Sequence, residues 1–116
     1  MPTPAFEFLN VTRQALANTL SDLAYLKETA PSRDERASYT SHFLRTQWEL
    51  HMVDQEINLL VRGRSKIIPP DQMLIDSLKA KANRIDQLTA TSQNASEILT
   101  LAAEVLAILN GVGRKN

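Results

Sequence analysis

The stretch RDERASYTSHFLRTQWELHMVDQEINLLVR, from Arg33 to Arg62, decides the fold because it predicts one long, uninterrupted helix. Ser32 precedes it and stands three residues before Glu35, which is the spacing of a capping box. Gly63 follows it, at the position where helices commonly end in a left-handed residue. A helix of roughly 30 residues, rising about 1.5 Å per residue, spans about 45 Å.

This helix carries two apolar faces. The first is a stripe with alternating four- and three-residue spacing, made of Tyr39, Phe43, Thr46, Leu50, Val53, Ile57 and Leu60. The second consists of Leu44, Trp48, Met52 and Leu59, and its mean direction lies roughly 190° from the first at about 100° per residue. A helix at the surface of a small bundle needs only one such stripe, so the second requires an explanation.

Three explanations remain open from the sequence. The long helix lies at the centre of the bundle, with the first helix on one side and the remaining helices on the other. Alternatively, the second face is the contact between two copies of the chain, or it binds a different protein. A chain this short has little material with which to surround a long helix, and Trp and Met are favoured in interface cores. We therefore predict that Leu44, Trp48, Met52 and Leu59 form a partner or oligomer interface.

Start and stop signals divide the rest of the chain into helices. We predict helices at about 4–29, 33–62, 70–91 and 95–109, followed by a frayed tail at 111–116. Thr3 and Pro4 suit the start of the first helix, and Pro31 disfavours helical geometry at the residue before it. Asn94 and Glu97 repeat the capping-box spacing and indicate a new helix start. The alternative is one continuous helix over the third and fourth segments.

The expected fold is therefore an all-α, antiparallel bundle of four helices in a single domain, 1–116. The first two helices form a hairpin because only two or three residues connect them. With 116 residues, 43% of them hydrophobic, the chain suits one domain and is not of the disordered class. It carries 13 basic and 13 acidic residues and no cysteine, which excludes disulfides and zinc–thiolate sites.

No apolar run is long enough to cross a membrane, since Thr100 and Glu104 interrupt the longest one, Ile98 to Leu109. The first residues contain no basic segment of the secretory type. We therefore expect a cytoplasmic protein without a membrane partner.

The sequence contains no glycine-rich phosphate loop and no nucleophile elbow. His42 and His51 lie on different faces of the long helix, so they do not share a metal ion. Glu49 and Glu56 share a helical face, which we interpret as a solvated acidic stripe. We expect no enzymatic activity, no cofactor and no metal.

The three cations Arg62, Arg64 and Lys66 lie within five residues at the end of the long helix. Such a cluster can contact an anion or nucleic acid, but it also simply complements the negative end of a helix. We therefore expect a non-enzymatic protein–protein interaction module, such as a small adaptor, an inhibitor or immunity-type protein, or an assembly subunit. A homodimer is the expected form, with another protein as the further possible partner. The alternative is a regulator that binds nucleic acid through the basic linker. No motif of a known family is recognised.

Overall fold

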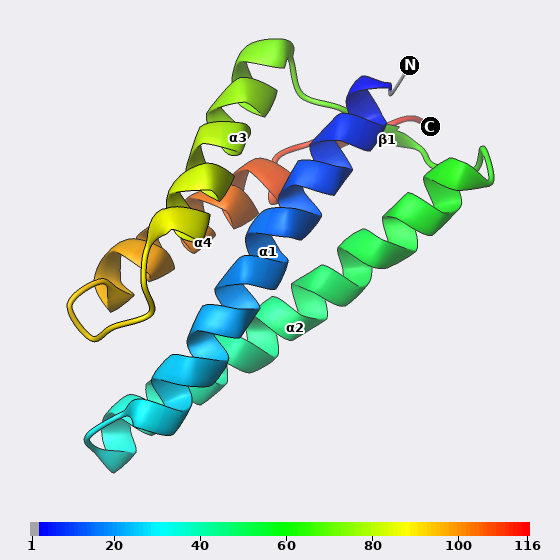
Figure 1. Ribbon diagram of the computed structural model, residues 1–116. Helices are drawn as coiled ribbons and strands as arrows, with labels where there is room; N and C mark the ends of the chain where they lie inside the picture. Colours follow the sequence, from blue (N-terminus) through cyan, green and yellow to red (C-terminus); the bar gives the residue numbers. More distant parts are fainter. Residues whose placement is uncertain (1–2) are drawn as a thin grey trace.

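In the computed structural model, which describes residues 3–116, the chain folds into four helices and a short two-stranded ladder. The helices are α1 (Pro4–Thr29), α2 (Arg33–Val61), α3 (Gln72–Gln87) and α4 (Ala95–Asn110), and the strands are β1 (Ile67–Ile68) and β2 (Gly113–Arg114). The molecule is elongated, with extents of 47 × 23 × 21 Å, and α1 and α2 form its long hairpin (Figure 1). The predicted all-α bundle of four helices is confirmed.

The hairpin begins and turns as its polar residues predict. The Thr3 hydroxyl accepts a hydrogen bond from the Phe6 backbone N–H at 3.1 Å and caps α1. The Ser32 hydroxyl accepts one from the Glu35 backbone N–H, also at 3.1 Å, and caps α2. Both side chains bind donors that have no partner within their own helix, which fixes where each helix starts.

Gly63 ends α2 in the predicted left-handed conformation, with φ of 70°. The Gly63 N–H donates to the Leu60 carbonyl at 3.0 Å, and the Arg64 N–H donates to the Leu59 carbonyl at 2.8 Å. These two bonds form a Schellman motif, which satisfies carbonyls that the helix leaves free. The chain therefore turns sharply away from α2 toward β1.

The central helix is α1, not α2. Figure 1 shows α1 between α2 and α3, and α1 packs against α2, α3 and α4, whereas α2 packs extensively only against α1 within the described residues. Eight residues of α1 are buried: Phe8, Leu9, Thr12, Ala15, Leu16, Thr19, Leu23 and Leu26. The explanation that places α2 at the centre is therefore wrong.

Two threonines make the central position of α1 possible. The Thr12 hydroxyl donates to the Phe8 carbonyl and the Thr19 hydroxyl donates to the Ala15 carbonyl, each at 2.8 Å. Both side chains are fully buried, and these bonds satisfy their polar atoms inside the core. These two threonines therefore extend the buried surface of α1 beyond its apolar residues.

The third and fourth segments are separate helices, as we favoured over one continuous helix. The helix α3 begins at Gln72 rather than at Pro70, because Asp71 is its cap and accepts from the Leu74 N–H at 3.0 Å. It ends at Gln87 rather than near 91, because Leu88 is already extended, with ψ of 127°.

The predicted capping box of Asn94 and Glu97 is wrong. The Asn94 amide donates to the Thr89 carbonyl at 2.9 Å and so closes the turn before α4 instead of capping it. Glu97 instead pairs with Arg84 of α3, at 2.6 Å from its Nε. The start of α4 is therefore fixed by contacts across the α3–α4 connection.

The predicted frayed tail is wrong for the residues that follow α4. Ile67 pairs with Arg114 and Ile68 pairs with Gly113 in an antiparallel ladder, and the Lys115 N–H donates to the Lys66 carbonyl at 2.6 Å. Residue Ile67 is buried and belongs to the main core. The ladder therefore fastens the segment after α4 to the linker between α2 and α3.

Glu56 is not a solvated residue, which corrects our interpretation of the acidic stripe. Its side chain is only 8% exposed, and Arg114 Nη1 lies 2.8 Å from its Oε1 atom. Its second oxygen, Oε2, is buried and has no hydrogen-bond partner among the described residues. Arg114 is thus the cation that compensates for burying this carboxylate.

None of the helices in residues 3–116 combines the length and the apolar composition that crossing a bilayer demands.

We predict that Arg114→Ala lowers the free energy of unfolding by about 1–3 kcal/mol, because it leaves the buried Glu56 carboxylate without its cation. Urea denaturation followed by circular dichroism measures this change. Lys115→Ala is the matched control, since only a backbone contact is seen for Lys115. Equal effects of the two substitutions would contradict a stabilising role of the ion pair.

A second carboxyl group is unfavourably placed between α1 and α3. Asp22 Oδ2 is buried without a hydrogen-bond partner among the described residues. Burial, together with the negative charge of Asp86, raises the pKa of Asp22 to about 6. The folded protein therefore holds a proton on Asp22 between about pH 4 and 6, where the unfolded chain has largely lost it.

It follows that Asp22 lowers stability as the pH rises through this window. We predict that Asp22→Asn raises the free energy of unfolding by about 1 kcal/mol at pH 7.5. The substitution has little effect at pH 4, because in the folded protein the protonated Asp22 is then as uncharged as the asparagine that replaces it. Thermal unfolding at the two pH values measures the difference. Glu28→Gln, at an exposed position of the same helix, serves as the control. A pH-independent effect of Asp22→Asn would contradict the raised pKa.

Candidate protein-binding face

The four interface residues predicted from the sequence lie together on one open side of α2. We call Leu44, Trp48, Met52 and Leu59 the outer face; these side chains are 58%, 60%, 42% and 40% exposed. The opposite stripe of α2 packs against the core with its larger apolar residues: Tyr39, Phe43, Leu50, Val53, Ile57 and Leu60. The structure thus uses one apolar stripe of α2 for folding and leaves the other uncovered.

The outer face is uncovered because of where the other helices lie. Helices α3 and α4 pack against α1 and against each other, and neither packs extensively against α2 within residues 3–116. The indole of Trp48 has His51 as its aromatic neighbour, with ring centroids 6.1 Å apart. A tryptophan that contributes little to the core is available for contact with another surface.

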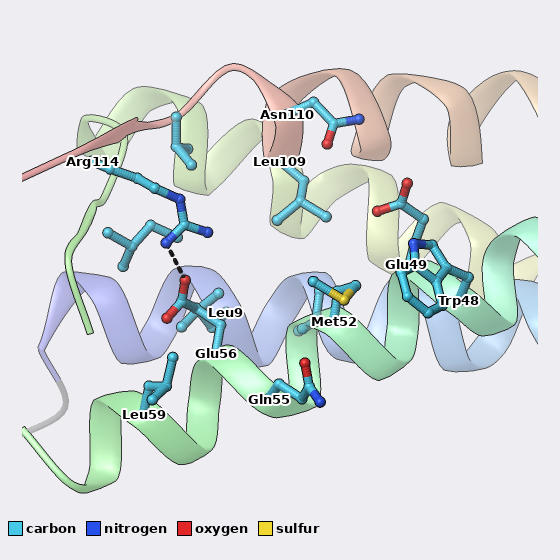
Figure 2. Close-up of a pocket in the computed structure, with 13 residues that line it drawn as sticks. Leu9, Trp48, Glu49, Met52, Gln55, Glu56, Leu59, Leu109, Asn110 and Arg114 are labelled. Carbon is cyan, nitrogen blue, oxygen red and sulfur yellow. Dashed lines mark ion pairs between the residues drawn. The ribbon is translucent and has the colours of Figure 1, made fainter. Parts of the chain in front are cut away.

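A hollow of about 420 Å³ adjoins the outer face (Figure 2). Its wall includes Trp48, Met52 and Leu59, and the residues that complete its apolar lining are Leu9, Val53, Ile67, Leu109 and Val112. The outer face therefore continues into a recess that reaches buried residues of α1 and β1. A volume of this size lies within the range of binding pockets in proteins.

The polar groups of the hollow are few. Figure 2 shows Arg114 joined to Glu56 across it, and Glu49, Gln55 and Asn110 complete its polar lining. The residues that line the hollow include no serine, cysteine, histidine or lysine, and its acidic groups are the carboxylates of Glu49 and Glu56. Within residues 3–116, no group of three histidine, cysteine or acidic residues is placed to hold a metal ion. The lining is suited to apolar contact.

Two further hollows, of about 530 and 240 Å³, lie between α2 and α4. The first is lined by Tyr39 and Leu99, among others, and the second by Thr46 and Leu106. Together with the hollow beside Trp48, they follow the length of α2. This arrangement agrees with the weak packing between α2 and α4.

The structure places a fourth cation, Lys115, beside the basic cluster predicted from the sequence. Arg62, Arg64 and Lys66 are exposed at the end of α2, and the ladder brings Lys115 beside Lys66, with the 2.6 Å backbone hydrogen bond already described. Arg114 also reaches this end of the molecule, but it is engaged with Glu56. Cations from two distant segments therefore gather at one end of the bundle.

Sequence reasoning missed the hollow and the position of Glu56. Both depend on residues 109–114, which lie 50 to 66 positions from their neighbours in α2. The available signal was weak: an apolar Val112 between two glycines, and the apolar pair Ile67–Ile68 in the segment between the second and third predicted helices.

Comparisons of the chain with protein-family models, with curated proteins and with solved structures gave no match.

Proposed function

We propose that this protein is a non-enzymatic protein–protein interaction module of the cytoplasm, such as a small adaptor, an inhibitor or immunity-type protein, or an assembly subunit. Its binding surface is the outer face of α2, centred on Trp48 and Met52. One observation carries the proposal: four large apolar side chains are exposed together on the side of α2 that faces away from α1. The partner is a second copy of the chain or another protein.

The energetics support a role in binding. Complete burial of a side chain of this type contributes about 1.5–3 kcal/mol, and the 40–60% of each that is still exposed corresponds to roughly 0.6–1.8 kcal/mol before the costs of association are subtracted. The exposed part of each side chain contributes nothing to the fold, and the contacts of α2 with the core come from its opposite stripe. The recess beside Trp48 and Met52 offers space for a side chain of the partner. Trp and Met are residue types that interface cores favour.

We predict that Trp48→Glu abolishes association while the helix content stays unchanged, because the indole lies outside the core. Light scattering measures the mass, a pull-down from extract of the source cells measures binding to other proteins, and circular dichroism measures the fold. Met73→Glu is the matched control, since Met73 is 82% exposed on α3 and lies outside the outer face. A Trp48→Glu variant that unfolds would place the indole in the core. Unchanged mass and unchanged capture would contradict the proposal.

A second candidate function is binding of nucleic acid through the basic end of the molecule. The observation that favours it is the approach of Lys115 to Lys66, which adds a cation to Arg62 and Arg64. These four cations are not engaged in ion pairs within the described residues.

For this second candidate we predict an affinity for generic duplex DNA that falls steeply with salt. Four phosphate contacts correspond to a slope of about −3.6 in a plot of log affinity against log salt concentration. Arg62→Ala reduces the slope by about 0.9, whereas Trp48→Glu leaves it unchanged. Fluorescence anisotropy between 20 and 200 mM salt measures it. No binding at 20 mM salt removes this candidate.

A further inference from the structure

We propose that the outer face binds a second copy of the chain, with the two α2 helices antiparallel and related by a two-fold axis at Trp48. This inference rests on the proposed function and specifies its partner. The inference is based on the order of the exposed residues along α2, which is symmetric. The apolar residues alone do not reveal this symmetry.

The exposed residues along this side of α2 are arranged symmetrically about Trp48. They are spaced by three, four, three, four, four, three, four and three positions: Asp34, Ala37, Ser41, Leu44, Trp48, Met52, Gln55, Leu59 and Arg62. All nine are exposed, and at about 100° per residue they lie within an arc of about 80°. This stripe runs for about 42 Å, which is nearly the whole length of α2.

The side chains of the stripe are complementary to those of a second copy when the two α2 helices run antiparallel. An antiparallel partner centred on Trp48 places Leu44 beside the partner's Met52, and Ala37 beside the partner's Leu59. Ser41 then lies beside the partner's Gln55, so polar residues meet polar residues. The two indoles stack at the axis, where aromatic pairs add to the burial of apolar area. Each contact occurs twice, as in every two-fold interface.

The charges at the two ends of the stripe select the antiparallel arrangement. Asp34 lies beside the partner's Arg62, and neither residue makes an ion pair within residues 3–116. A parallel pair of α2 helices would instead bring Asp34 next to Asp34 and Arg62 next to Arg62. The antiparallel arrangement also places the positive end of each helix dipole beside the negative end of the other.

The rest of the fold leaves room for this arrangement. Helix α1 packs on the opposite side of α2, and α3 and α4 lie against α1, so none of them covers the stripe within the described residues. The dimer then has α1 on its two outer sides and the paired α2 helices at its centre.

Disulfide formation between engineered cysteines tests the arrangement, because the natural chain contains no cysteine. We expect an oxidised mixture of Ser41→Cys and Gln55→Cys chains to give mainly the mixed dimer. Each variant alone gives little, because its two cysteines lie about 21 Å apart along the helices, beyond the reach of a disulfide. Met73→Cys, outside the stripe, measures crosslinking by random collision.

Each outcome of the crosslinking has a defined meaning. Efficient crosslinking of Ser41→Cys with itself indicates a parallel pair and overturns this inference, while the proposed function stands. A wild-type chain that is monomeric by light scattering at 100 μM, yet captures another protein through Trp48, also overturns this inference and leaves the proposed function standing. A monomer without any capture that depends on Trp48 overturns both.

Charge reversal provides an independent test on surface residues. We expect Asp34→Arg and Arg62→Asp each to weaken the dimer by about three- to tenfold, because both copies of an exposed ion pair become repulsive. The double variant, which exchanges the two charges, recovers most of the wild-type dissociation constant in sedimentation equilibrium. Additive weakening in the double variant would show that Asp34 and Arg62 do not meet.

Discussion

The burial of α1 on several sides is the constraint on which the rest of the structure depends. Helix α1 is the only helix in residues 3–116 that packs extensively against all the others. It tolerates this position because the Thr12 and Thr19 hydroxyls bind carbonyls of their own helix and need no water. With α1 at the centre, α2 becomes an outer helix that needs a single apolar stripe. The second stripe of α2 is therefore left for other contacts.

Features that depend on neighbours in the sequence could be predicted from it. The caps formed by Thr3 and Ser32 and the left-handed Gly63 each need only a few adjacent residues, and all three formed as expected. The two stripes of α2 follow from its periodicity, and the structure separates them as the pattern indicates. Whether the outer stripe meets a partner depends on a second molecule, so that part stays a prediction.

Features that depend on distant residues could not be predicted in the same way. Glu97 pairs with Arg84 of α3 instead of completing a capping box, and the burial of Glu56 requires Arg114, which lies near the end of the chain. The central position of α1 was hidden because threonine counts as polar in a periodicity analysis. The ion pairs of Glu97 and Glu56 are tertiary contacts, whereas the Thr12 and Thr19 hydrogen bonds lie within α1 and let polar residues enter the core.

The ladder between β1 and β2 has a consequence for how the bundle opens. It joins the end of α4 to the linker that precedes α3, while the turn at Pro31 joins α1 to α2 at the opposite end of the hairpin. Helix α4 cannot move away from the start of α3 without breaking this ladder, and its movement away from the hairpin also separates Arg114 from Glu56. The ladder thus closes the segment from β1 to β2 into a ring, so α3 and α4 are held together at both ends and separate from the hairpin only as one unit.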